Sequence, residues 1–135
     1  MEGNNPTYRK YSFPKRERLS SKKLIDALFT KGASFYFYPF SIRFLPADER
    51  ANCHQFMVSV SKRNFKKAVD RNRIKRLLRE SYRLQKHLLE ENLPANKFFM
   101  IAYIYTGKEI HSFEFIESKL ADSFKRFKKQ VEKVS

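Results

Sequence analysis

The sequence predicts an α/β (α+β) fold in which the elements follow one another in the order α-β-β-α-β-α. Three observations lead to this prediction. The chain has 135 residues, the length of one domain, and its 14 Phe and 7 Tyr supply a sizeable core. Apolar residues recur at the 3.6-residue spacing of a helix in three segments. In three other segments they alternate with polar residues or form a short continuous run, as in strands.

The chain begins with a segment that shows no period and contains Gly3 and Pro6. We therefore expect residues 1–11 to form a flexible leader before a single domain of residues 12–135. The first helix is predicted to begin at Ser20 or Ser21, which can cap it, and to run to about residue 29. Gly32 is expected to stop it.

Two strands are predicted next, because polar and apolar side chains alternate over residues 40–45 and again over residues 56–61. The stretch between them, residues 46–52, is polar and turn-like, so we expect a hairpin to connect the two strands. An aromatic cluster at the start of the first strand is interpreted mainly as core packing: Tyr36, Phe37, Tyr38 and Phe40.

A long helix is predicted over about residues 68–91, with a length on the order of 35 Å, and Pro94 marks its end. Residues 98–105 are apolar on both faces, so they predict a strand in the centre of the sheet. The last helix is predicted over residues 113–131, where cations near the C-terminus suit the helix dipole.

The long helix carries the strongest functional signal. Advancing about 100° per residue from Ile74 places the later leucines on its half of the cylinder, and cationic side chains on the other half. Between residues 62 and 86, eleven Lys and Arg stand against Asp70 and Glu80. A solvated helix face normally mixes signs, whereas guanidinium groups match phosphate oxygens in two hydrogen bonds at once. The pattern favours a polyanion as the partner over an ordinary solvated face.

The whole chain has a formal charge of +15 and a pI near 10.1, which points to nucleic acid or an anionic membrane surface. A membrane partner is disfavoured, because no apolar run approaches about 18 residues and no signal peptide is visible. We therefore expect a cytoplasmic protein.

Residues for catalysis or metal binding are not evident. Cys53 is the single cysteine, so no internal disulfide is possible, and no Cys or His residues have metal-ligand spacing. His54, His87 and His111 lie far apart in the sequence, and each is interpreted as a surface or satisfied histidine. Cys53 and His54 are adjacent, so on a strand they would point to opposite faces.

A second basic group precedes the first helix and is interleaved with aromatic residues: Tyr8, Arg9, Lys10, Tyr11, Phe13, Lys15, Arg16, Arg18, Lys22 and Lys23. Aromatic rings among cations suit a single strand of nucleic acid, because bases stack on the rings while the cations follow the backbone. The alternative for the residues before Phe13 is a disordered basic tail.

The string RNRIKRLLRESYR at residues 71–83, preceded by SVSKR at residues 59–63, resembles the RNR signature of the bacterial ribonuclease P protein component. The resemblance extends over about residues 13–129 and includes KRERL at residues 15–19. It implies an α/β sandwich with a mixed sheet and a left-handed crossover between parallel strands. The residue patterns alone do not predict that crossover, because such connections are nearly always right-handed.

The resemblance also implies a function: a protein that binds a large catalytic RNA and assists it in removing the 5′ leader from precursor tRNA. The RNA performs the hydrolysis with Mg²⁺, so the protein subunit has no catalytic or metal-binding residue of its own. One protein monomer is expected for each RNA. The residues implied to face ribonuclease P RNA are Lys62, Arg63, Arg71, Asn72, Arg73, Lys75, Arg76 and Arg79. Those implied to hold the leader, in a cleft between the first helix and the sheet, are Phe13, Arg16, Arg18, Ile25, Phe29 and Phe40.

Other classes of function share the charge and size of this chain. A ribosomal-type structural RNA-binding protein would confer no processing activity, and the RNR string argues against it. A self-contained ribonuclease would use the distant histidines and cleave RNA without an RNA subunit. A DNA-binding protein is less favoured, because the long helix follows a strand and not the short helix and turn of the usual DNA readers.

Overall fold

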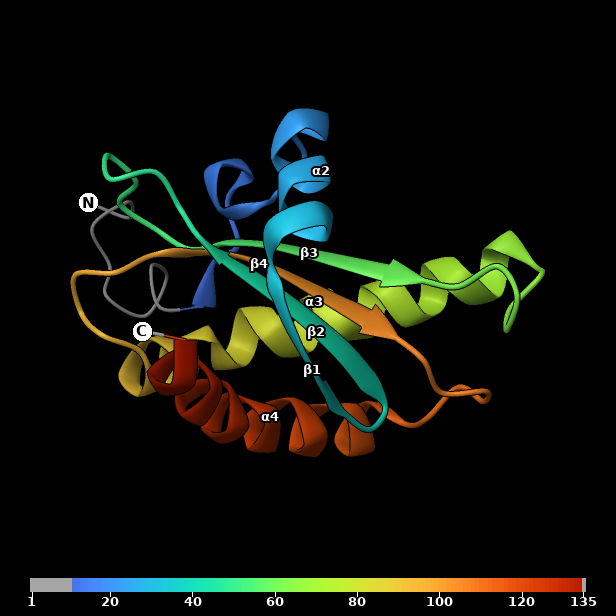
Figure 1. The fold of residues 1–135 in the computed structure, drawn as a ribbon. Helices are drawn as coiled ribbons and strands as arrows, with labels where there is room; N and C mark the ends of the chain where they lie inside the picture. The colour runs from blue at the N-terminus through green and yellow to red at the C-terminus, as the bar shows by residue number, and fades with distance from the viewer. Residues whose placement is uncertain (1–10, 135) are drawn as a thin grey trace, which may run out of the picture.

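A four-stranded sheet separates one short helix from two long ones (Figure 1). The computed structural model describes residues 11–134, so the predicted flexible leader lies, but for Tyr11, outside the described residues. Helix α2 lies on one face of the sheet, and α3 and α4 lie on the other. The elements are η2 (Lys15–Glu17), α2 (Lys22–Lys31), β1 (Ala33–Phe37), β2 (Phe40–Pro46), β3 (Gln55–Val60), α3 (Ala68–Asn92), β4 (Phe99–Tyr105) and α4 (Phe113–Val134).

The sheet has the strand order β1-β2-β4-β3. Strands β1 and β2 form an antiparallel hairpin, β2 and β4 are antiparallel, and β3 and β4 are parallel. The sheet is therefore mixed, and α3 makes the crossover between the parallel strands. The hand of this crossover stays a prediction from the family resemblance.

The hairpin expected between the predicted strands of residues 40–45 and 56–61, which are β2 and β3, is wrong. Strand β4 lies between them, because its side chains are buried on both faces and only a central position covers both. The partner of β2 on its other side is β1, which the sequence pattern did not reveal. In β1 both the inward side chains, such as Phe35, and the outward Tyr36 are aromatic, so no polar and apolar alternation was visible.

The predicted helices are confirmed closely. Helix α2 begins after Ser21, whose side chain accepts a hydrogen bond from the Leu24 amide (3.3 Å), and it ends before Gly32. A Cβ at Gly32 would lie 2.4 Å from the Leu28 carbonyl oxygen and 3.0 Å from that of Phe44. The close approach of α2 to β2 therefore requires glycine. Helix α3 ends within one residue of the prediction, ahead of Pro94.

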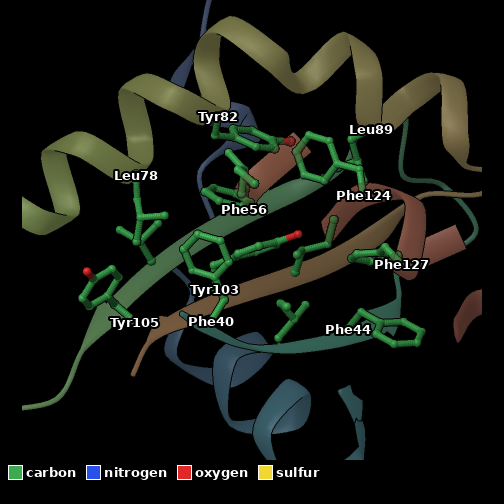
Figure 2. Close-up of a cluster of buried hydrophobic side chains, with 14 of the residues drawn as sticks. Phe40, Phe44, Phe56, Leu78, Tyr82, Leu89, Tyr103, Tyr105, Phe124 and Phe127 are labelled. Atoms are coloured by element: carbon green, nitrogen blue, oxygen red, sulfur yellow. The ribbon is translucent and has the colours of Figure 1, made fainter. Parts of the chain in front are cut away.

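The main core lies between the sheet and the helices α3 and α4 (Figure 2). The rings of Phe56 on β3 and Tyr82 on α3 stack with their centroids 3.7 Å apart. The buried Ser123 hydroxyl donates to the Leu120 carbonyl (2.6 Å), so the Tyr103 hydroxyl, 2.7 Å away, donates to Ser123. This packing fixes α3 against the sheet and determines which of its sides faces outward.

Candidate nucleic-acid interface

The outward side of α3 is cationic. Asn72, Arg73, Arg76 and Arg79 are exposed, while Ile74, Leu78 and Tyr82 are buried against the sheet, as the helical spacing predicts. None of these three arginines pairs with a carboxylate among residues 11–134. Their guanidinium groups are therefore available to phosphate oxygens. Lys75 is half-buried on the same helix.

Two other arginines of α3 serve the protein itself. Arg71 donates from one guanidinium nitrogen to the carbonyls of Phe65 and Lys66, both at 2.8 Å. These bonds hold the end of the loop on which Lys62 and Arg63 are exposed. We therefore assign Arg71 a positioning role beside its predicted contact with RNA.

The second of these arginines, Arg83, lies where the N-terminal segment reaches α3. It pairs with Glu80 and donates to the Tyr11 carbonyl (2.7 Å). The hydrogen bond from Arg83 lowers the pKa of Glu80, so this carboxylate stays charged and occupied by its neighbour. Arg83 thereby links the N-terminal segment to α3.

A buried ion pair anchors the same segment further along. Glu17 of η2 accepts a hydrogen bond from Lys86 of α3 at 2.6 Å, and both side chains are buried. Beyond η2, the Leu19 amide donates to the Phe56 carbonyl (3.0 Å), so the chain runs beside β3. Lys86, one of the eleven Lys and Arg counted between residues 62 and 86, thus belongs to the interior.

This anchoring brings two predicted surfaces together. The ring of Phe13 packs edge-on against Tyr82 (centroids 5.4 Å apart), and the Arg18 guanidinium lies 5.3 Å above the Phe13 ring. Both residues line an open hollow of about 870 Å³ that also touches α3 through Asn72, Arg76 and Arg79. The sequence assigned Phe13 and Arg18 to the leader and the α3 residues to the catalytic RNA. The structure places all five around one hollow.

The remaining predicted leader-binding residues are divided. Arg16 is exposed on η2, and its carbonyl accepts a hydrogen bond from the Gln55 side chain (3.2 Å). On α2, Ile25 packs toward the small cluster that covers Met100 and Ala102, while Phe29 is 37% exposed. The Arg43 guanidinium lies 5.3 Å over the Phe29 ring, so this ring is held at the border of α2 and the sheet.

The predicted contact of Phe40 with the leader is wrong. Its side chain is fully buried in the main core, where it packs on Tyr103 (centroids 5.3 Å apart), and so it cannot touch a ligand. Alternation along β2 places Phe40, Ile42 and Phe44 inward, toward α3 and α4. The outward residues of β2 are therefore Ser41, Arg43 and Leu45.

Sequence reasoning missed the residues that line the open face of the sheet. The pairing register brings side chains from all four strands into one row on the α2 side, which α2 does not bury: Tyr36, Ser41, Ile104 and Ser59. The alternation within β2 and β3 was visible in the sequence. The register between the strands was not, because it depends on β4 lying in the centre.

A hydrolytic site of the protein's own is not supported. His54 is buried and its Nδ1 accepts the Phe99 amide (3.0 Å), and burial lowers the pKa of His54 to about 4. Burial also raises the pKa of the Cys53 thiol. The fold does bring Cys53, His54 and His87 to one hollow, which the sequence did not reveal. A neutral imidazole with one nitrogen occupied and a protonated thiol make a poor acid-base pair.

No group of three or more His, Cys, Asp or Glu side chains among residues 11–134 is placed to hold a metal ion. No helix of the described residues is both long and apolar enough to cross a bilayer.

Comparison with known proteins points to one family. The sequence profile of the Ribonuclease P family matches residues 13–128. The ribonuclease P protein component of Porphyromonas gingivalis is 36% identical over 118 residues, which cover 86% of each chain. That of Chlorobium phaeobacteroides is 35% identical over 124 residues, covering 82% of this chain and 84% of the relative. The solved RNase P protein of Thermotoga maritima has a TM-score of 0.66 at 27% identity, covering 82% of this chain and 96% of that one.

Proposed function

The chain belongs to the ribonuclease P protein family, and from that premise we propose how it takes part in removing the 5′ leader from precursor tRNA. It is the protein subunit of a holoenzyme in which the RNA subunit performs the hydrolysis. One copy binds one RNA through the cationic side of α3, in the cytoplasm. The same copy binds the leader along the surface beside α2 that includes Phe29, Arg43, Ser41 and Ser59, which we call the leader surface.

The observation that carries this proposal is the exposed set of arginines on α3 that pairs with no carboxylate of residues 11–134: Arg73, Arg76 and Arg79. Cations near the N-terminus of a helix oppose its dipole, and here Arg71 and Arg73 stand in the first turns with Asp70 as the acidic neighbour. Phosphate groups would relieve that repulsion and also suit the dipole. The helix therefore gains stability from a partner with phosphates, which an ordinary solvated face would not require.

The leader surface suits a single strand of RNA without fixing its sequence. Phe29 offers a partly exposed ring, and Arg43 places a positive charge beside it. Stacking on a ring tolerates every base, and contacts to phosphates position a strand without reading it. An enzyme that acts on many leaders needs this kind of contact.

Mg²⁺ enters the proposal as an ion held mainly by the RNA subunit. The described side chains form no cluster that fits a metal, so no step is assigned to a protein-bound ion. The protein contributes positive charge, which lowers the repulsion between the two RNA molecules and so the Mg²⁺ concentration needed for their association.

The test is precursor-tRNA cleavage by the protein alone, by a bacterial ribonuclease P RNA alone at low Mg²⁺, and by the two together. Cleavage at the mature 5′ end is expected only in the mixture. Cleavage by the protein alone would instead establish a protein-only nuclease. If the mixture is inactive although the protein binds that RNA, and exchange for other bacterial ribonuclease P RNAs changes nothing, the protein is a structural RNA-binding protein.

A further inference from the structure

Two tyrosines at the turn between β1 and β2 are unusually exposed for large aromatic side chains. Tyr36 is 56% exposed and Tyr38 is 45% exposed, whereas their neighbours Phe35 and Phe37 pack against the main core. Aromatic rings left in solvent on a rigid element commonly mark a binding surface. The sequence interpretation of this cluster as core is thus half right, since Phe37 and Phe40 point inward and the two tyrosines outward.

The two tyrosines line one hollow. It has a volume of about 500 Å³ and is bordered by Tyr36, Tyr38, Thr106, Lys108 and Glu109. Lys108 is exposed and supplies a positive charge at its rim. The carboxylate of Glu109 repels phosphate, so the composition of this hollow suits an uncharged, flat group with an anionic backbone passing near Lys108.

The Tyr38 ring is held in place before any ligand arrives. Its hydroxyl lies 3.1 Å from His111 Nε2, and the two rings meet edge to face with centroids 5.9 Å apart. His111 in turn stacks on Phe115 of α4, with centroids 4.0 Å apart. A ring fixed by packing loses little entropy when a ligand stacks on it, which favours binding.

The hollow lined by Tyr36 and Tyr38 lies at one end of a row of residues that crosses the leader surface. Tyr36 is the β1 member of the row Tyr36, Ser41, Ile104 and Ser59, which crosses the open face of the sheet from edge to edge. Tyr38 lies one residue beyond the end of β1, in the turn to β2, and lines the same hollow as Tyr36. The row therefore ends at this hollow on the β1 edge, while its other end reaches β3, the strand beside α3.

We infer that Tyr36 and Tyr38 form a stacking platform for bases of the precursor-tRNA leader that lie far upstream of the cleavage site. The inference rests on the proposed function. The catalytic RNA is held at α3, next to β3, so leader nucleotides near the scissile bond lie at that end of the row. Nucleotides further upstream then cross the sheet to β1. Short leaders end before they reach the platform, and long leaders fill it.

The test compares two precursors, one with a leader of about ten nucleotides, within the roughly 4–16 that single-strand grooves cover, and one with about two. The quantity measured is the ratio of kcat/KM for the long leader to that for the short leader in the reconstituted holoenzyme. The double variant Tyr36→Ala/Tyr38→Ala is expected to lower this ratio by about tenfold or more, since each stacked base contributes about 1–3 kcal/mol. Tyr36→Phe keeps the ring and is expected to keep the ratio.

Charge at the rim is tested with a matched pair. Lys108→Ala is expected to lower the ratio a few-fold, while Lys97→Ala, an exposed lysine ahead of β4, is expected to leave it unchanged. An unchanged ratio in the tyrosine double variant overturns the inference, and so does an equal loss for both leaders, which would show a general defect. If the wild-type holoenzyme cleaves neither precursor, the proposed function fails instead.

Discussion

Phe29 and Leu24 are both 37% exposed on α2, and the Arg43 guanidinium of the leader surface lies over the Phe29 ring. Phe29→Ala is therefore expected to weaken binding of precursor tRNA by roughly 1–3 kcal/mol, the cost of one stacked base. Binding of mature tRNA, which has no leader, should not change. The measurement is the dissociation constant of the assembled holoenzyme for each of the two tRNAs.

Leu24→Ala is the matched control for Phe29→Ala, since it removes an equally exposed apolar side chain from the same helix and should leave both constants unchanged. Equal losses for precursor and mature tRNA in the Phe29 variant would contradict the assignment of Phe29 to the leader surface. They would show that Phe29 supports the fold and does not touch the leader.

His54 makes folding stability depend on pH. Its pKa is about 4 in the folded protein against 6.5 for the free side chain, so the unfolded chain binds the proton more tightly. The contribution of neutral His54 is fully present above pH 6.5 and is lost as the pH falls toward 4. Between pH 7 and pH 5 the free energy of unfolding should fall by about 2 kcal/mol from this group alone.

The measurement is urea denaturation at both pH values for the wild type and for His54→Asn. The Asn side-chain oxygen can accept the Phe99 amide in place of Nδ1, and it does not titrate. The variant should therefore lose less stability on acidification than the wild type. A loss of the same size in both proteins would show that other groups carry the pH dependence.

The alternation along β2 separates the two faces of the strand but does not show which of them is buried. Alternation was visible over residues 40–45, and it correctly placed Phe40 and Arg43 on opposite faces. The family resemblance assigned Phe40 to the leader, but Phe40 is buried, which leaves Arg43 as the residue of this pair on the outward face. A shift of one residue exchanges the two faces of a strand, so site assignments on strands are more fragile than those on helices.

At the scale of elements, η2 and α3 are joined by a contact that no sequence pattern predicts. Glu17 and Lys86 are 69 residues apart in sequence and form a buried ion pair. Lys86→Met leaves the Glu17 carboxylate buried without its partner and should lower the free energy of unfolding by about 3–5 kcal/mol. Urea denaturation measures this loss.

Two further variants separate pairing from burial. Glu17→Leu/Lys86→Met removes both charges and should recover most of the lost stability, because a buried ion pair is often replaceable by apolar groups. Arg50→Met breaks the exposed pair with Asp48 and should cost less than about 1 kcal/mol. A double variant as unstable as Lys86→Met would show that the unpaired charge of Glu17 is not the cause of the loss.

The cationic side of α3 should act as a unit toward RNA. Arg73→Ala/Arg76→Ala removes two exposed guanidinium groups and should weaken binding to ribonuclease P RNA, with the slope of log K against log salt flatter by about 1–2 units. Lys125→Ala/Lys129→Ala removes the same charge from the exposed side of α4 and should leave the slope unchanged. Titration of RNA binding over a series of salt concentrations measures both, and equal slopes in the two variants would mean that only net charge matters.

How far the elements could be predicted depended on their length and pattern. All three helices and the central position of β4 followed from periodicity and from apolar composition. Strand β1 was not predicted, because its outward Tyr36 is aromatic and hides the alternation. As a result, the hairpin was assigned to the wrong pair of strands. Strand pairing joins residues distant in sequence, and a local pattern carries little information about it.

At the scale of the whole molecule, the two proposed binding surfaces meet at the β3 edge of the sheet. The hollow lined by Phe13, Arg18 and Arg76 lies where the N-terminal segment runs between β3 and α3. The leader surface lies on the sheet face that carries α2 and reaches the same strand at Ser59. One small domain can therefore hold the catalytic RNA at one side of this edge and lead a single strand away from it on the other.

This arrangement predicts that assembly and substrate discrimination can be separated by mutation. Arg73→Ala/Arg76→Ala weakens assembly but leaves the leader surface intact. A protein concentration well above the weakened dissociation constant should therefore restore the wild-type preference for precursor over mature tRNA. Phe29→Ala leaves α3 intact, so the holoenzyme should assemble normally and show a reduced preference at every protein concentration.

The measurement is the ratio of the two tRNA affinities as a function of protein concentration, for each variant and for the combination of both. The combined variant should need the higher protein concentration and, once assembled, show the Phe29 defect alone, because the substituted residues share no partner in the described structure. If saturating protein fails to restore discrimination in the arginine variant, the α3 surface contacts the substrate as well as the catalytic RNA. In that case the two surfaces work as one continuous site across the β3 edge.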